Sequence, residues 1–283
     1  RQSKMKLTSG CYDCLRRLIA QAADLATTDG SLRRKALEKA MNILESEFSY
    51  DQISIVLATK IHHVIKEVTG NADPYRAMKE KEMAIAAEVY LEIVSRYKGD
   101  FENYVKLAAV ANAIDFFKEL GEIKEDMGKP VDFAIDDSRY LRRKLKSGGK
   151  VLYLADNPGE LYFDLPLLNQ MKRFADVTYV VKPSPVQNDV TIEDIRKAGL
   201  EGDFGRIITI GVASPGIDFD LASGEFKREF ESADLIFAKG MGYYESLSEL
   251  PRQGRFFYCL KAKCKPVARS LGVPVNSYVA MLW

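Results

Sequence analysis

Polar residues that could bind a divalent cation follow the first two β-rich runs in the second half of the chain. Asp156 and Asn157 come directly after the run VLYLA at 151–155, and Asp189 follows the next run. Carboxylate and amide oxygens suit a hard divalent cation, and neighbouring strand ends would bring all three together. The pattern favours a metal site of Asp156, Asn157 and Asp189, although each residue also suits a helix N-cap.

Lysines stand at the ends of the later β-rich runs. Lys239 ends the apolar run ADLIFA and precedes a glycine, and Lys261 and Lys263 follow the run FFYCL. Ammonium groups bind phosphate as point charges, and glycine lets backbone N–H groups approach an anion. These residues predict a ligand that carries phosphate. The alternative is a solvated basic edge, which we favour for Lys265.

Further polar residues are candidates for substrate binding. Glu160 and Glu245 could bind sugar hydroxyls or move protons, although both also suit a helix surface. Asn112 and Asp115 interrupt the apolar stretch AAVANAIDFF on one helical face. Buried polar groups need partners, so this pair is expected to cap a neighbouring element or to face the site.

The few cysteines and histidines limit other chemistry. Cys11 and Cys14 form a CxxC pair that could join Cys264 in a three-thiolate metal site or act as a redox pair. Buried, inert thiols are the favoured interpretation. His62 and His63 are the only imidazoles, which disfavours both a multi-histidine metal site and a Ser-His-Asp relay.

Two halves with different periodicity must position these residues. Apolar residues recur at helical spacing before residue 148, so we predict a helical domain over 1–147. A second domain over 148–283 contains five short apolar runs separated by helical segments, which predicts βαβ units and a mostly parallel sheet. The C-terminal VPVNSYVAMLW is expected to add an edge strand. Ligands of such sheets bind outside the carboxyl ends of the strands. The five predicted strands are 151–155, 177–181, 206–210, 235–239 and 256–260.

Composition narrows the class of protein. The chain has 283 residues, 47% hydrophobic and 29% charged, with a net charge of +1. This balance disfavours a disordered chain and a basic nucleic-acid binder. Neither an apolar run of about 20 residues nor the apolar core of a signal peptide is present. We therefore expect a cytoplasmic protein without membrane or nucleic-acid partners.

Several ordered motifs together resemble one known family. They are LADNPGE at 154–160 with Phe163 and Asp164, VVKPSPVQNDVT at 180–191, ADLIFAKGMGYYESL at 233–247 and LKAKCKPVA at 260–268, supported by NADPY at 71–75 and ANAIDF at 111–116. They resemble the metal-dependent damage-control phosphatase family, formerly a domain of unknown function (family eighty-nine). The CxxC pair and the late cysteine resemble its small prokaryotic and archaeal branch.

The resemblance implies a fold, a site and an activity. The fold would be α/β: a helical domain followed by a Rossmann-like three-layer α/β/α domain. One divalent ion (Mg, Mn, Co or Ni) would be bound by Asp156, Asn157 and Asp189. The activity would be hydrolysis of phosphomonoesters of sugars or other damaged metabolites. Asp156, Asp189 and Lys239 would be catalytic, and the implied substrate contacts are Lys239, Glu160, Asn112, Asp115 and Ser214.

Two other functions remain open at this point. An S-adenosylmethionine-dependent carboxyl methyltransferase would usually place a glycine-rich loop after the first strand, where DNPGE has one glycine. A non-catalytic protein that binds a metal or a phosphorylated metabolite would use most of the same residues as a phosphatase. The attacking group is also open, because either water or the carboxylate of Asp156 could serve.

Overall fold

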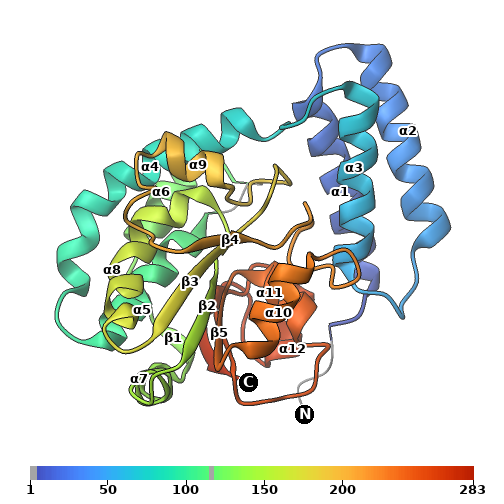
Figure 1. Ribbon diagram of the computed structural model, residues 1–283. Helices are drawn as coiled ribbons and strands as arrows, with labels where there is room; N and C mark the ends of the chain where they lie inside the picture. Colours follow the sequence, from blue (N-terminus) through green and yellow to red (C-terminus); the bar gives the residue numbers. More distant parts are fainter. Residues whose placement is uncertain (1–4, 115–117) are drawn as a thin grey trace.

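A seven-stranded sheet forms the centre of the protein (Figure 1). The computed structural model describes residues 5–114 and 118–283. The strand order is β1-β7-β6-β5-β2-β3-β4, and every neighbouring pair is parallel except β6 and β7. The strands are β1 (Phe133–Asp136), β2 (Lys150–Leu154), β3 (Asp176–Val181), β4 (Ile207–Thr209), β5 (Leu235–Lys239), β6 (Phe256–Lys261) and β7 (Tyr278–Leu282).

The predicted α/β class with a mostly parallel sheet is confirmed. The five predicted runs form β2 to β6, to within one residue at each end. Two expectations were wrong. The first half of the chain contains β1, and β7 is not an edge strand, because β1 pairs beside it. A strand of only four residues leaves little periodic signal in the sequence, and its partner β7 lies near the C-terminus.

Helices cover both faces of the sheet. Tyr153 of β2 packs on one face, while Leu152 and Leu154 pack on the other, as the alternation of strand side chains requires. The first face is covered by α4 (Arg76–Ile93), α5 (Phe101–Val110), α6 (Leu120–Gly128), α7 (Ser138–Leu145), α8 (Leu161–Lys172) and α9 (Ile192–Lys197). The second face is covered by α10 (Gly224–Ser232), α11 (Met241–Leu247) and α12 (Lys265–Leu271).

The first three helices form a bundle with its own apolar core. They are α1 (Ser9–Ala26), α2 (Gly30–Glu47) and α3 (Ser54–Thr69), at the right of Figure 1. The Asp29 side chain caps α2 by accepting hydrogen bonds from Ser31 N and Leu32 N at 2.7 and 2.9 Å. The predicted helical half therefore supplies both this bundle and, through α4 to α7, part of the cover of one face of the sheet. In the part of the chain that the structure describes, no helix has the length and apolarity to cross a bilayer.

Candidate active site

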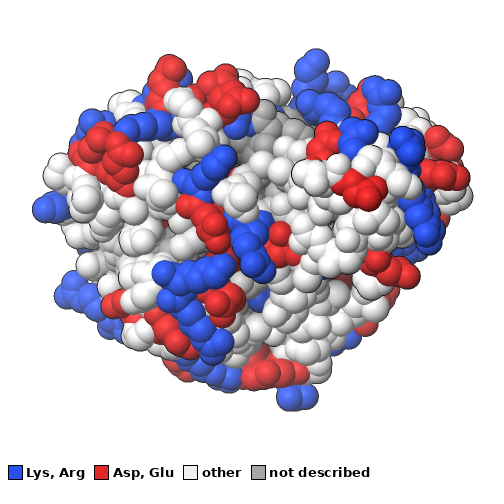
Figure 2. All heavy atoms as spheres, turned by 90° about the horizontal axis from the view of Figure 1, so that it is seen from above, with Lys and Arg blue, Asp and Glu red and all other residues white. Residues whose placement is uncertain are grey.

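A cavity of about 600 Å³ lies between the helical bundle and the carboxyl ends of the strands. Its walls come from the start of α1, the start of α3, and the segments that follow β2, β3, β5 and β6. Acidic and basic side chains are interspersed over the face of the molecule shown in Figure 2, without an extended field of one sign. A cavity of this size suits a small metabolite.

The three predicted metal ligands line this cavity. Val190 N donates to the carbonyl oxygen of Asp156 at 2.8 Å, so the segments after β2 and β3 lie side by side. Asn157 is buried, and its Oδ1 has no hydrogen-bond partner among the described residues. A buried amide oxygen left unpaired beside carboxylates needs a cation or a donor. Asp156, Asn157 and Asp189 therefore fit a divalent metal ion.

Electrostatics at this end of the cavity also favour a cation. Burial raises the pKa of Asp156, and repulsion from Asp189 raises it further. Burial likewise raises the pKa of Asp189, although Lys182, whose Nζ lies 3.5 Å from Asp189 Oδ2, opposes the rise. Lys182 also lies 4.7 Å from the centre of the Tyr243 ring. The two carboxyl groups are thus desolvated and repel each other, and a bound cation would relieve both effects.

The backbone after β5 packs directly on Asp156. A Cβ atom at Gly240 would lie 2.1 Å from Asp156 Oδ2, and Gly240 has a φ of 82°. Only glycine satisfies both the contact and this backbone conformation. Gly240 is one of the two glycines in KGMG that were expected from the sequence to let an anion approach. It therefore also fixes the position of a predicted ligand.

Lys239, Glu160 and Asn112 lie beside the cavity but do not line it. All three are completely buried. The Nζ atom of Lys239 donates to Ala108 O at 2.6 Å and to Asp164 Oδ1 at 2.8 Å. It also forms a 2.6 Å ion pair with Glu160 Oε2, in a direction poor for a hydrogen bond. These three oxygen atoms surround the ammonium group, which is completely buried and does not reach the cavity, so Lys239 is not placed to bind a phosphate.

The remaining predicted contacts divide between the site and its surroundings. Asn112 Nδ2 donates to Asp156 Oδ2 at 2.9 Å, so this residue touches a predicted ligand. Ser214 is buried and accepts from Asp218 N at 3.3 Å, and it does not line the cavity. Asp115 lies outside the described residues. The structure thus brings Asn112 to the site and places Ser214 behind its wall.

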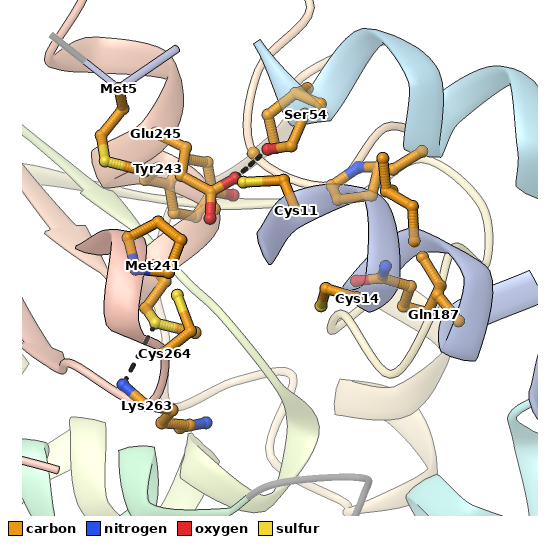
Figure 3. Close-up of a pocket in the computed structure, with 18 of the residues that line it drawn as sticks. Met5, Cys11, Cys14, Ser54, Gln187, Met241, Tyr243, Glu245, Lys263 and Cys264 are labelled. Carbon is orange, nitrogen blue, oxygen red and sulfur yellow. Dashed lines mark hydrogen bonds between the residues drawn. The ribbon is translucent and has the colours of Figure 1, made fainter. Parts of the chain in front are cut away.

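Lys263 is the lysine that reaches the cavity close to the predicted ligands. Its Nζ donates to Ile114 O, and its charge lowers the pKa of Asp156, against the effect of burial. Its backbone N donates to Met241 Sδ at 3.3 Å (Figure 3). Of the three lysines that the sequence suggested for phosphate, Lys239 is buried away from the cavity and Lys261 Nζ lies 3.4 Å from Asp126 Oδ2. Lys263 is therefore the best placed.

Two charged residues of α4 were missed by the sequence analysis. Lys79 and Glu82 are each 1% exposed. Lys79 Nζ lies 3.2 Å from Asp194 Oδ2, and Glu82 Oε2 accepts from Asn188 Nδ2 at 3.2 Å, next to Asp189. Burial raises the pKa of Glu82 to about 8. Their helical spacing could have shown that they are buried, because both lie on the same face of α4 as its buried apolar residues.

Thiols and one carboxylate also line the cavity. Cys11, Cys14 and Cys264 are free and partly exposed around the same open space in Figure 3. Burial and Glu245 raise the pKa of Cys14 and Cys264, which makes these thiols weak nucleophiles. Across residues 5–114 and 118–283, no three Cys, His, Asp or Glu side chains are placed to hold a metal. The alternative of a three-thiolate metal site was therefore wrong, and the thiols are less buried than expected.

Glu245 joins the bundle to the second domain. Its Oε2 accepts a hydrogen bond from Ser54 Oγ at the start of α3 (Figure 3). Burial raises the pKa of this carboxyl group. Because Glu245 also lines the cavity, it can accept a hydrogen bond from a ligand that reaches from the metal-binding end.

Comparisons with known proteins agree with this architecture. The damage-control phosphatase ARMT1-like domain matches residues 7–279. Damage-control phosphatase PH1575 of Pyrococcus horikoshii is 36% identical over 98% of both chains. A damage-control phosphatase of Archaeoglobus fulgidus is 34% identical over 98% of this chain and 99% of its own. The crystal structure of a DUF89 family protein from P. horikoshii covers 98% of this chain and 99% of its own, with a TM-score of 0.87 and 36% identity. The chain belongs to the damage-control phosphatase ARMT1-like domain family.

Proposed function

We propose that the protein is a metal-dependent phosphatase that hydrolyses phosphomonoesters of small metabolites. The observation that carries this proposal is the unpaired, buried Oδ1 of Asn157 beside Asp156 and Asp189, in a cavity that Lys263 also lines. The names of two archaeal relatives support the reaction class. Sugar phosphates and other damaged phosphorylated metabolites are the proposed substrates.

Asp156, Asn157 and Asp189 would hold one divalent ion, for which Mg, Mn, Co and Ni are the candidates. When bound, the ion would supply Lewis-acid stabilisation of the charge that develops on the phosphoryl group. Lys263 would bind a second phosphoryl oxygen through its ammonium group. Asn112 holds the Asp156 carboxylate in place through the 2.9 Å hydrogen bond.

The rest of the cavity would receive the leaving group. Glu245 can accept a hydrogen bond from a hydroxyl of that group, and the wall formed by α1 and α3 would exclude water from the reacting phosphate. The four free cysteines suit a reducing compartment, so we propose that the activity is cytoplasmic.

A phosphate-release screen tests this function. Purified protein is incubated with a panel of phosphomonoesters and with Mg, Mn, Co or Ni in turn, and we expect phosphate release with at least one metal. Asp189→Ala removes one of three ligands and should abolish the metal-dependent release. Asp220→Ala, at an exposed aspartate, is the control that should retain it.

Two results would contradict the proposal. One is full hydrolysis by Asp189→Ala in the presence of a chelator. The other is binding of phosphomonoesters without turnover in any metal, which would favour a non-catalytic binding protein. Tight binding of S-adenosylmethionine without metal, measured by calorimetry, would instead favour the methyltransferase.

A further inference from the structure

A connected set of buried polar side chains lies behind the proposed metal ligands. It consists of Asp164, Lys239, Glu160, Asn157 and Asn112, which we call the buried polar network. We propose that Glu160, Lys239 and Asp164 are positioning residues, which orient Asn157 and Asp156 toward the metal and do not contact substrate. This inference rests on the proposed metal site and goes beyond it, because it assigns a different role to side chains expected to bind phosphate.

Glu160 determines which atom of Asn157 faces the cavity. Its Oε1 accepts hydrogen bonds from Asn157 Nδ2 at 3.1 Å and from Asn112 Nδ2 at 2.7 Å. The amide nitrogen of Asn157 therefore points at Glu160, whose oxygen accepts from it. Its Oδ1 is then directed away from Glu160, where no described residue satisfies it. The amide is thereby presented to a cation by its oxygen.

Lys239 places its ammonium group against the carboxyl groups of Glu160 and Asp164, at 2.6 and 2.8 Å, in a site from which water is excluded. Burial alone would lower the pKa of Lys239, but Asp164 and Glu160 raise it above its usual value. All three side chains are 0% exposed. With oxygen atoms of Ala108, Asp164 and Glu160 within 2.8 Å, the ammonium is fully surrounded. Its role in this arrangement is to hold the Glu160 carboxylate.

The sheet itself anchors the far end of the network. Asp164 Oδ1 accepts from Tyr153 OH and Asp164 Oδ2 accepts from Tyr179 OH, both at 2.7 Å. These tyrosines are paired residues on the parallel strands β2 and β3, with ring centres 5.3 Å apart. The strands that carry the predicted ligands at their ends thus also fix Asp164, and through it Lys239 and Glu160.

A second branch of the network reaches Asp156. Asn112 Nδ2 donates to both Glu160 Oε1 and Asp156 Oδ2, and Asn112 Oδ1 accepts from Lys261 N at 2.8 Å. All polar atoms of the Asn112 side chain are therefore used within the protein. Asn112 links Glu160 to the Asp156 carboxylate, so two of the three proposed ligands are oriented by one buried glutamate.

The test measures metal binding and not only activity. The amide of Glu160→Gln would present an N–H group either to Lys239 or to the two asparagines. One of these contacts would then place two hydrogen-bond donors opposite each other. We expect Mn²⁺ affinity by calorimetric titration to fall about 10–100-fold, with an altered Co²⁺ absorption spectrum. Tyr179→Phe removes an outer contact and should cause a smaller loss in the same direction. Tyr258→Phe is the matched control, because its buried hydroxyl has no partner among the described residues.

Circular dichroism and thermal melting establish that each variant is folded before its affinity is compared. Unchanged Mn²⁺ affinity in folded Glu160→Gln would overturn the inference. A raised KM for a phosphomonoester with unchanged Mn²⁺ affinity and Co²⁺ spectrum would also overturn it, because that is the result of a lost substrate contact. If the wild-type protein binds none of Mg, Mn, Co and Ni, the metal site fails and the inference with it.

Discussion

The tightest constraint on a single residue in the site is the contact between Gly240 and Asp156. Gly240→Ala would place a methyl group 2.1 Å from Asp156 Oδ2, so the carboxylate must move. A displacement of about 1 Å in a catalytic site can cost about 100-fold in rate, and we expect at least that loss of phosphate release. Gly254→Ala is the control, because Gly254 also has a positive φ but nothing within 4 Å of its Cβ position.

The control variant should keep wild-type turnover and lose only about 1–2 kcal/mol of stability, the cost of a left-handed conformation in a residue with a side chain. Phosphate release and urea unfolding, measured side by side, separate the two effects. Equal activity of the two variants would show that the position of Asp156 against Gly240 is not required for hydrolysis.

The sequence predicted those residues of the site that follow the end of a strand. Asp156, Asn157 and Asp189 were expected together, and they line one cavity; their role as ligands stays a prediction. The surroundings of Lys239 were not foreseeable, because its partners Ala108 and Asp164 are 131 and 75 residues away in the chain. Whether a lysine is enclosed by acceptors or reaches a cavity depends on such distant contacts, which have no signature in local sequence.

Among the elements, α3 carries a buried histidine that should make stability depend on pH. His62 is buried against Tyr75 in the core of the bundle, and burial, with a smaller effect of Lys66, lowers its pKa to about 3. Since the pKa in the unfolded chain is about 6.5, His62 is neutral in both the folded and the unfolded protein above that pH, and folding then requires no deprotonation. The stabilisation is lost as pH falls from about 6.5 toward 3.

We therefore expect the wild-type protein to lose about 2 kcal/mol of unfolding free energy between pH 7 and pH 5 through this residue, at about 1.4 kcal/mol per pH unit below 6.5. His62→Phe should lack this loss, whereas His63→Phe, at the exposed neighbouring position, should retain it. Urea unfolding at the two pH values measures the difference. The same pH dependence in both variants would exclude His62 as its source.

The strands and helices differ in how well the sequence predicted them. β2 to β6 were located to within one residue because each is a short apolar run bounded by polar or glycine-rich turns. β1 was missed because its four residues alternate between partly buried and exposed, and because its partner β7 lies almost 150 residues later. Periodicity reports the burial of a segment, but it does not report which distant segment pairs with it.

At the scale of the molecule, the cavity separates two structural units. The bundle of α1 to α3 has its own core, and polar contacts to the remainder include Ser54 to Glu245 and Lys66 Nζ to Pro185 O at 2.8 Å. Helical periodicity predicted the helices of the first half, but not their division between the bundle and the sheet. Because α1 and α3 form one wall of the cavity and the strand ends form another, a bound ligand would contact both units.

Ligand binding should therefore slow amide hydrogen exchange in the bundle as well as at the strand ends. With Mn²⁺ and inorganic phosphate bound, we expect slower exchange in the first half of α1 and at the start of α3, because Cys11, Cys14, Ser54 and Ile55 line the cavity. Residues 187–190 should respond in the same way. Helix α2 is the internal control, since no described residue of it lines this cavity, and its exchange should not change. Slower exchange confined to the strand ends would show that the effect of bound metal and phosphate does not extend to the bundle.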